Sequence, residues 1–480
     1  MTRIHRLLPV LVAVLRAASL SAQVERGHLT SGVLAITNVT VIPMTTDTVL
    51  HGATVVVRDG RIVAVGPARD VPVPTGARRI DGKGRYLIPG LADMHVHLYA
   101  DGAVPDSVAP YELGVMVANG VTTARIMSGT PEHFGLRADV AAGRVRGPQL
   151  WIASPQFAGK PYENTRVVTT PEEARVAVRQ MADSGYDFIK LTLHISRPVY
   201  DAVVDEARRA GIRVIGHVDP QVGVARAIAA GQQIEHLDNY FEAVLADSAP
   251  MKESVSGGFV YRLQNWPSLD FVDDRKLAAV AGATARAGIW SVPTLVVFNE
   301  AFAIGHSDDE IRRRPDWALM PAEQRDLYLK TRTRYWSAAN AEVRTDARRR
   351  RYVQVRNALV KAIHDSGGRI MAGSDTPEWF HAYGFGLHRE LQALVQAGLT
   401  PWQALEAATR YPAEFLGGAR DWGTIAPGMR ADLVLLDADP LADIRHATRI
   451  VGVALGGTWM ERGALDRMVQ DAARRLGPGA

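Results

Sequence analysis

The sequence of 480 residues predicts an α/β fold, because eight apolar, strand-like runs alternate with longer helical patterns through its middle. A second observation concerns the two ends of the chain, where short strands are separated by turns. Eight parallel strands with intervening helices are typical of a (β/α)8 TIM-like barrel. We therefore expect such a barrel, with a small composite β-sandwich domain built from the N- and C-terminal flanks.

The first 22 residues have the pattern of a signal peptide. A basic start precedes an apolar run from Leu7 to Leu15, and small residues from Ser19 to Ala22 suit cleavage. Arg16 interrupts the run, so a disordered extension is the alternative. We expect a secreted or periplasmic protein. No later run approaches the ~20 apolar residues that cross a bilayer, so we expect no membrane contact after export.

The strand-rich flanks are expected to fold together. Residues 33–86 contain alternating apolar residues around Asp59-Gly60, which is a strong hairpin signal. Residues 419–468 repeat this style, with strands broken at Pro427-Gly428 and Gly456-Gly457. These two segments are predicted to form the β-sandwich, and residues 87–418 the barrel.

The barrel strands can be placed on the sequence in order. Between them lie helical patterns, such as the one that begins after Thr170 as N-cap and the one that ends before Gly211. Residues 306–351 exceed one crossover helix, so we expect an extra helical excursion over the barrel mouth, either a lid or a plain surface insertion. The eight predicted strands are LIPGLADMHVH, GVTTARIM, PQLWIASP, DFIKLTL, RVIGHV, QIEHL, WSVPTLVV and RIMAGSD.

The composition of the chain limits the partners and the metal ligands that it can have. The net charge is only +4, and the arginine run at 348–351 is better explained as a solvated helix face than as a basic patch, so no nucleic-acid partner is expected. The chain has no cysteine, which excludes disulfides, thiolate ligands and a cysteine nucleophile. Any bound metal must be held by nitrogen and oxygen atoms.

Polar residues interrupt the apolar strands near their C-terminal ends, where an unpaired polar group is costly to bury. His95 and His97 lie two apart, so both point to one face of the first strand. A single histidine at a strand end is more often part of the core than a ligand, and the aspartate of Gly-Ser-Asp could cap a helix. The set recurs on successive strands and comprises His95, His97, Lys190, His217, His236 and Asp375.

Lys190 is the unusual member of this set. It is one of only seven lysines and lies between Ile189 and Leu191, where burial would favour the neutral amine. A neutral amine can react with carbon dioxide to give a carbamate, an anionic oxygen ligand able to bridge two metals. The six residues then supply nitrogen and oxygen donors for two divalent metal ions, with Zn²⁺ as the expected metal.

The chain resembles the amidohydrolase superfamily, and within it the imidazolonepropionase-like and prolidase-like hydrolases that have a lysine on the fourth strand. The resemblance implies a role for each residue: the more buried metal would be held by His95, His97 and Asp375, the second metal by His217 and His236, and a carboxylated Lys190 would bridge them. In the family a metal-bridging hydroxide attacks the scissile carbonyl, while the aspartate of the eighth strand passes a proton to the leaving amine. The motifs that carry the resemblance are PGLADMHVH, GVTTAR, DFIKL, GHV, IEHL, VPTL, GSDTP, GLHRELQALVQAGLTPWQALEAATRYPAEFLG and GTIAPGMRADLVLLDADPL.

Two departures from the family pattern concern the substrate rather than the metals. An aspartate often follows the second strand's arginine in the family, but Ile126 stands there in this chain. The turn after Lys190 reads TLHISRP instead of a glycine-rich turn.

Residues just beyond the strand ends are candidates for reading the substrate. Tyr240 could donate to the carbonyl oxygen or oxyanion, and packing on the barrel rim is the equal alternative. His194, Arg197 and Arg125 are candidates for a substrate carboxylate, although an arginine is more often a surface or salt-bridge residue. His388 could line the pocket floor or simply pack at the start of its helix.

The sequence therefore predicts a metal-dependent hydrolase acting on carbon–nitrogen bonds, peptide bonds included. The expected substrate is a small molecule, a dipeptide or an N-acyl amino acid. The alternatives are a lactone, phosphoester or cyclic-imide hydrolase on the same site and, less favoured, a non-catalytic binding protein on this fold. A homo-oligomer is compatible with the sequence.

Overall fold

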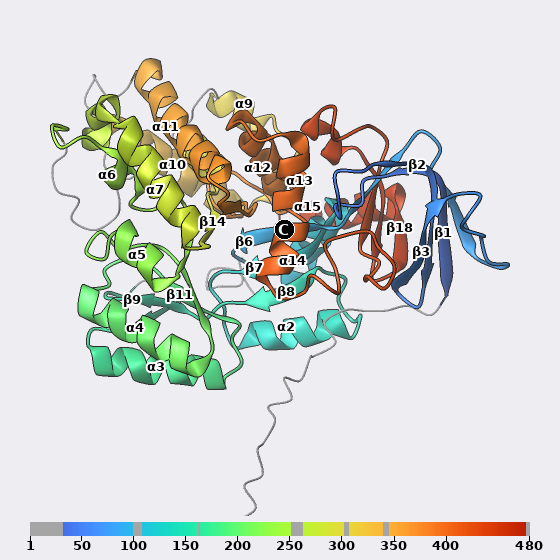
Figure 1. The fold of residues 1–480 in the computed structure, drawn as a ribbon, viewed down its shortest axis with the longest axis horizontal. Coiled ribbons are helices and arrows are strands. Elements are labelled where there is room, and N and C mark those ends of the chain that lie inside the picture. The colour runs from blue at the N-terminus through green and yellow to red at the C-terminus, as the bar shows by residue number, and fades with distance from the viewer. Residues whose placement is uncertain are drawn as a thin grey trace, which may run out of the picture.

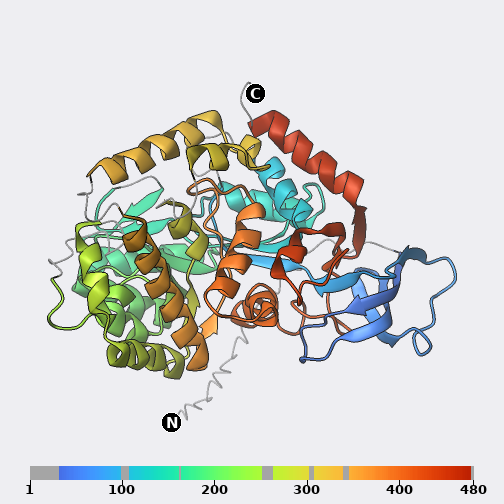
Figure 2. The same cartoon turned by 90° about the horizontal axis from the view of Figure 1, so that it is seen from above.

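The computed structural model describes residues 32–98, 108–161, 164–250, 263–301, 307–338 and 345–476. The predicted signal peptide, residues 1–22, lies outside the described residues. Figure 1 shows barrel strands surrounded by helices, with a separate sheet beside them whose first strands are drawn in blue. Figure 2 shows the same two parts from above, with α10 (Ala322–Ala338) and α15 (Arg462–Leu476) along one edge of the molecule.

The two flanks of the chain pair in one sheet of eight strands. β5 and β16 join them, with Leu433 opposite Pro89 and Leu436 opposite Tyr86. The flanks therefore come together as predicted, but they form a single sheet, so a sandwich of two packed sheets is not confirmed. The strands are β1 (Val33–Val41), β2 (Leu50–Arg58), β3 (Arg61–Pro67), β4 (Arg78–Asp81), β5 (Tyr86–Pro89), β16 (Leu433–Leu436), β17 (Ile450–Leu455) and β18 (Thr458–Glu461).

All eight predicted barrel strands are found, and they pair in parallel. They fall into a three-stranded sheet, β6-β7-β8, and a seven-stranded sheet, β10-β9-β11-β12-β13-β14-β15. The strands are β6 (Leu91–Val96), β7 (Val121–Ile126), β8 (Gln149–Ile152), β9 (Gln156–Ala158), β10 (Thr165–Val167), β11 (Phe188–Leu191), β12 (Arg213–Gly216), β13 (Gln233–Glu235), β14 (Trp290–Val292) and β15 (Arg369–Ile370).

The barrel is TIM-like without being one continuous sheet. Its two sheets meet at single parallel bridges, one between Ala153 and Phe188 and one between Val96 and Thr376. The chain passes from the flank sheet into the barrel at Gly90, where a Cβ would lie 2.2 Å from the Thr122 hydroxyl oxygen. Only glycine fits there, which explains the Pro-Gly before the first barrel strand.

Helices cover the barrel strands. Thr170 caps α3 through a capping box with Glu173, and Gly211 ends α4 with φ 70°, as the sequence predicts. The helices are α1 (Ala109–Ala118), α2 (Glu132–Ala141), α3 (Pro171–Asp183), α4 (Arg197–Ala210), α5 (Val224–Ala230), α6 (Tyr240–Val244), η4 (Leu263–Phe271), α7 (Asp274–Arg286), α8 (Leu295–Ala301), α9 (Asp308–Arg312), η5 (Trp317–Leu319), α10, α11 (Asp346–Asp365), α12 (Phe385–Gln396), α13 (Pro401–Ala407), α14 (Arg410–Phe415), η6 (Ile444–Thr448) and α15.

Apolar side chains fill one end of the barrel. Met94, Phe188 and Ile215 from three strands, with Met371 directly after β15, form a buried cluster that also includes Phe415 from the end of α14. Separate clusters lie between strands and helices and within the flank sheet. The apolar cluster at the end of the barrel packs against the buried guanidinium of Arg125, which lies over the rings of Phe188 and Phe415.

The charged stretch after α8 forms the predicted helical excursion, within the parts of it that the structure describes. Tyr328 of α10 stacks on Trp379, with ring centroids 5.6 Å apart, and its hydroxyl donates to Glu378 Oε2 at 3.2 Å. Glu378 and Trp379 follow Asp375 in the loop after β15. The excursion thus packs on the loop that carries Asp375, and a lid role stays a prediction.

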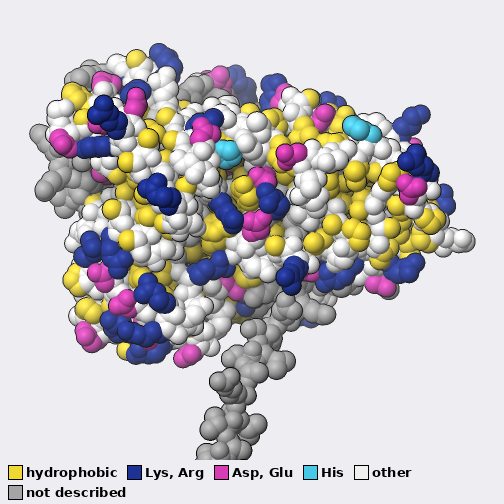
Figure 3. Space-filling view, in the orientation of Figure 1, with side chains coloured by type: hydrophobic (Ala, Val, Ile, Leu, Met, Phe, Trp, Pro, Cys, Tyr) yellow, Lys and Arg dark blue, Asp and Glu magenta, His cyan; other side chains and the backbone are white. Residues whose placement is uncertain are grey.

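Basic and acidic side chains are interspersed on the face drawn in Figure 3. Among the described residues, no helix combines the length and the apolar character that a membrane span requires.

Candidate metal centre

Three of the predicted ligands meet where β6 and β15 end. His95 Nε2 lies 3.1 Å from Asp375 Oδ1, and His97 Nε2 lies 3.4 Å from the same oxygen. The two Nε2 atoms are 3.3 Å apart. One ligand atom from each residue falls within 4.8 Å of the others, which suits a single metal ion.

His236 and His217 extend this cluster. The His236 ring centroid is 4.8 Å from that of His95 and 4.6 Å from that of His217. His236 Nδ1 lies 3.7 Å from Asp375 Oδ2, the second oxygen of the carboxylate. Burial and the neighbouring His217 lower the pKa of His236 well below its usual value. The imidazole is therefore neutral, as metal binding requires.

Lys190 is fully buried on β11, and burial lowers its pKa to about 8. Its Nζ has no hydrogen-bond partner among the described residues. Gly216 on the neighbouring strand leaves room for this side chain, because a Cβ there would lie 2.9 Å from Lys190 Cδ. A buried amine without a partner is costly unless another group completes its environment.

Glu235 supports His95 from below. Its Oε2 lies 2.7 Å from His95 Nδ1, and its Oε1 accepts a hydrogen bond from Arg125 Nη2 at 2.6 Å. Burial would raise the pKa of Glu235, but the charge of Arg125 and the neighbouring His95 outweigh it and hold the pKa at about 2. With Nδ1 engaged by the carboxylate, His95 presents Nε2 to the cluster.

Arg125 has no exposed surface. Its Nε donates to the Met94 carbonyl at 2.7 Å, and its Nη1 donates to Gln233 Oε1 at 2.8 Å. The guanidinium therefore donates to protein acceptors inside the barrel. The structure gives no support to its predicted contact with a substrate carboxylate.

The other two histidines are held by loop residues. Thr294 Oγ1 lies 2.7 Å from His236 Nδ1, and Asp238 Oδ2 lies 2.8 Å from His217 Nδ1. Arg356 of α11 donates to the carbonyl of His236 at 3.1 Å and to that of Pro293 at 2.7 Å. This arginine therefore ties together the loops that follow β13 and β14.

Asp375 is held between β6 and β15. Its backbone N–H donates to the His95 carbonyl at 2.7 Å, and Asp93 accepts a hydrogen bond from Ser374 N at 2.9 Å. Burial would raise the pKa of Asp375, but the neighbouring His95 and the hydrogen bonds from His95 and His97 hold it well below its usual value. The carboxylate is therefore ionised and available to a cation.

The remaining predicted residues lie elsewhere. Tyr240 is buried, and its hydroxyl lies 2.8 Å from Thr284 Oγ1 on α7, so the structure does not support a role as donor to a substrate. His388 Nε2 donates to the Asn119 carbonyl at 2.9 Å, which places this ring against the segment after α1.

His194 and Arg197 both follow β11. The His194 backbone N–H donates to Asp219 Oδ2 at 2.6 Å. Arg197 begins α4, and its Nε lies 3.5 Å from Asp201 Oδ2, with half of the side chain exposed. Their roles toward a substrate stay predictions.

The residues that hold the ligands were not predicted from the sequence. Glu235 and Asp238 were visible in the sequence beside His236, as acidic residues near a candidate ligand. The backbone of His236 is left-handed, with φ 61°, which breaks the strand alternation and lets Glu235 and His236 both serve the barrel interior. Thr294 and Arg356 carried no sequence signal, because their contacts depend on tertiary packing.

A TIM-like barrel with histidines and an aspartate gathered at the ends of its strands defines a class of barrel proteins that carry a metal-ligand cluster. The sequence profile of the amidohydrolase family matches residues 86–460, and the chain belongs to this family. Members of this family generally use divalent metal ions, and the nitrogen and oxygen donors of His95, His97 and Asp375 suit such an ion.

Curated relatives match over different extents. The imidazolonepropionase of Acidiphilium cryptum is 46% identical over 232 residues, which cover 38% of this chain and 57% of that protein. The adenine deaminase of Deinococcus radiodurans is 25% identical over 440 residues, 90% of this chain and 62% of that protein. The chain spans 52% to 62% of the length of the three adenine deaminases that match most of it.

Solved structures resemble the whole fold. A protein from Bifidobacterium longum, assigned as a prolidase, has a TM-score of 0.65 and 25% identity, covering 92% of this chain and 99% of its own. Bottromycin amidohydrolase has a TM-score of 0.71 and 23% identity, covering 93% of this chain and 91% of its own, and this likeness concerns the fold alone.

Proposed function

We propose that the protein is a binuclear metal-dependent amidohydrolase that cleaves the amide bond of a dipeptide or an N-acyl amino acid. The observation that carries this proposal is the buried Lys190 amine, which lacks a hydrogen-bond partner among the described residues. It belongs to the strand-end set that also contains the four histidines and Asp375. A single metal held by His95, His97 and Asp375 would leave Lys190 without a role.

Six residues would hold two metals in this proposal. The neutral Lys190 amine adds to carbon dioxide, forming a nitrogen–carbon bond and releasing one proton, so the side chain ends in an anionic carbamate. The expected metal is Zn²⁺. When bound, the two ions would supply a nucleophile at neutral pH and polarise the scissile carbonyl. One metal would be held by His95, His97 and Asp375, the other by His217 and His236, with the Lys190 carbamate between them.

Asp375 is the proposed general base and acid. Its Oδ1 faces His95 and His97, while Oδ2 lies 3.7 Å from His236 Nδ1 and is the oxygen we assign to proton transfer. It takes a proton from the attacking water and delivers it to the leaving nitrogen. Glu235, Thr294 and Asp238 hold the imidazoles in place during this exchange and do not touch the substrate.

The proposed substrate class follows one of the solved structures that cover most of both chains, the Bifidobacterium longum protein assigned as a prolidase. The imidazolonepropionase match covers a smaller part of the chain and favours the alternative of a cyclic amide or imide. Lactones and phosphoesters would use the same metals, because the nucleophile is indifferent to the leaving group.

Metal analysis of the purified, metal-loaded protein tests the binuclear site. We expect about two equivalents of divalent metal per chain. Lys190→Met should lower both the metal content and the activity, whereas Lys361→Met, at an exposed lysine paired with Asp365, should change neither. About one equivalent that is insensitive to Lys190→Met would refute the binuclear assignment.

A substrate screen tests the amide assignment. Dipeptides and N-acyl amino acids should be hydrolysed, and lactones, cyclic imides and phosphotriesters should turn over more slowly. If only the esters react, the metal site stands and the amide assignment fails.

We also propose that the protein is exported, on the pattern of residues 1–22. N-terminal sequencing of the mature protein should start near Gln23, and an intact Met1 in the purified protein would refute export by cleavage.

A further inference from the structure

A cavity lies away from the metal centre, between the barrel and the flank sheet. It has a volume of about 300 Å³ and is lined by Thr122 and Gln149 near the starts of β7 and β8, and by Leu455 and Thr458 at the turn between β17 and β18. His95 and Asp375 stand at the opposite, C-terminal ends of the strands. The cavity is therefore separate from the proposed catalytic site.

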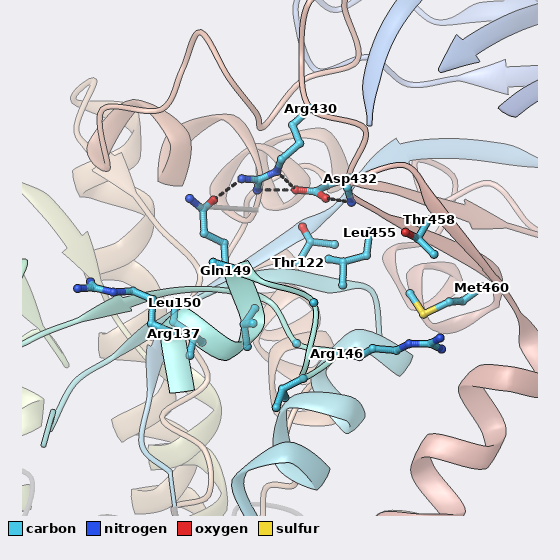
Figure 4. Close-up of a pocket in the computed structure, with 16 residues that line it drawn as sticks. Thr122, Arg137, Arg146, Gln149, Leu150, Arg430, Asp432, Leu455, Thr458 and Met460 are labelled. Atoms are coloured by element: carbon cyan, nitrogen blue, oxygen red, sulfur yellow. Dashed lines mark hydrogen bonds and ion pairs between the residues drawn. The ribbon is translucent and has the colours of Figure 1, made fainter. Parts of the chain in front are cut away.

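The cavity has apolar walls from both sides of this junction. Val145 and Leu150 come from the barrel side, and Leu455 and Met460 come from the flank sheet. Figure 4 shows Met460 and Arg146 reaching the pocket from these two sides. The volume is at the small end of the range for ligand pockets, about 300 to 1,000 Å³, which suits a ligand of roughly ten heavy atoms.

Most charged groups around the cavity are neutralised within the protein. Arg430 Nε donates to Asp432 Oδ2 at 2.6 Å, and its Nη1 donates to Gln149 Oε1 at 2.6 Å, as the dashed lines in Figure 4 mark. Arg137 Nη1 lies 2.9 Å from Asp187 Oδ2. These groups shape the polar wall without leaving a charge for a ligand.

Arg146 is different. Its side chain lines the cavity and is exposed, and it forms no hydrogen bond or ion pair with any residue that the structure describes. One positive charge beside an apolar cavity complements a single anionic group attached to an apolar body.

We propose that this cavity binds a small amphipathic carboxylate, with its apolar part between Leu150, Leu455 and Met460 and its carboxylate at Arg146. The ligand bridges the segment between α2 and β8 and the turn between β17 and β18. It thereby holds the flank sheet against the barrel and stabilises the folded chain in proportion to its occupancy. The site takes no part in the hydrolysis, so it stands whether or not the proposed activity is correct.

Isothermal titration calorimetry of the metal-loaded protein with octanoate tests this site. We expect saturable binding of one octanoate per chain, with octan-1-ol and inorganic phosphate each at least about tenfold weaker, since each lacks one half of the recognised chemistry. Arg146→Gln should weaken octanoate binding about tenfold, because one charge-assisted hydrogen bond is lost. Arg146→Lys should keep most of the affinity.

The matched control is Arg144→Gln, which removes an exposed arginine two residues away that pairs with Asp139 and does not line the cavity. It should bind octanoate like the wild type. Leu455→Trp should abolish binding by filling the cavity, with thermal unfolding as the check that the variant is folded.

Three results would overturn the proposal: no saturable binding of octanoate, equal binding of octan-1-ol, or equal effects of Arg146→Gln and Arg144→Gln. The last result would mean that the carboxylate binds elsewhere, the metal centre included.

Discussion

The two halves of the metal centre are supported in different ways. The strand half consists of His95 and His97 with Glu235 and Arg125, and its support lies on strands β7 and β13 inside the barrel. The loop half consists of His217 and His236 with Asp238 and Thr294. Its support comes from residues that follow strands, in backbone that is left-handed at His236, with φ 61°, and at Thr294, with φ 42°.

The two halves should therefore differ in how much stability is lost when one of their residues is substituted. The strand half contains an ion pair with no exposed surface, so removing one partner leaves the other charged and buried. The loop half relies on a hydroxyl and a partly exposed carboxylate, whose loss leaves no buried charge unpaired. Changes to the strand half should therefore affect folding and metal binding together, and changes to the loop half mainly metal binding.

The largest effect is expected at Asp375, the residue that both halves share. Asp375→Asn keeps the shape of the side chain but removes its charge and its ability to accept a proton. We expect kcat to fall about 10³-fold, within the range for general acid–base groups. Steady-state kinetics on the best substrate of the screen measures it. A fall of less than about tenfold would mean that Asp375 does not transfer the proton.

The next effect is expected at Glu235. Glu235→Gln leaves Arg125 buried without its counter-ion, so we expect a loss of about 3 to 5 kcal/mol in the free energy of unfolding. Metal affinity should fall about 10- to 100-fold, because His95 loses the carboxylate that orients it. Urea unfolding and metal titration measure the two effects. The variant Arg125→Met/Glu235→Leu should recover much of the stability but not the metal affinity.

The dependence of the unfolding free energy on pH, on the acid side, gives a second test of the Glu235 ion pair. Its pKa is near 2 in the folded protein, against 4.5 for an unperturbed glutamate. The ionised carboxylate therefore contributes stability that is present above about pH 4.5 and is lost as the pH falls toward 2. The unfolding free energy of Glu235→Gln, measured across this pH range, should fall less steeply than that of the wild type. Parallel curves would show that the pair does not stabilise the fold.

A smaller effect is expected at Thr294 in the loop half. Thr294→Val keeps the shape but removes the hydroxyl beside His236 Nδ1. We expect about 1 kcal/mol of lost stability and about tenfold weaker metal binding. Thr284→Val, at a buried threonine whose hydroxyl faces Tyr240, is the control and should leave metal binding unchanged. If Thr294→Val destabilises the protein as much as Glu235→Gln, the contrast between the halves is wrong.

The sequence predicted the strands and their end residues well because both depend on local pattern. Each of the eight apolar runs became a strand, and the polar residues that close them gather at one end of the barrel. The role of Arg125 could not be predicted from local sequence pattern, because its partner Glu235 lies 110 residues further along the chain. Tyr240 follows His236 by one helical turn in sequence, but left-handed residues at 236, 237 and 239 redirect the chain, and its hydroxyl meets α7.

The sandwich of two sheets was not confirmed for a related reason. Alternation and turn signals predict strands and hairpins, but they do not say whether distant strands join one sheet or two. β5 and β16, separated by most of the chain, pair directly and merge the flanks into one sheet.

The carbamate that we propose on Lys190, between two metals, decides between a binuclear and a mononuclear site. Carbon-13 NMR of the metal-loaded protein, prepared in ¹³C-bicarbonate, tests it most directly. We predict one carbamate resonance per chain, absent in Lys190→Met and retained in Lys361→Met. No such resonance, or the same resonance in Lys190→Met, would contradict the account.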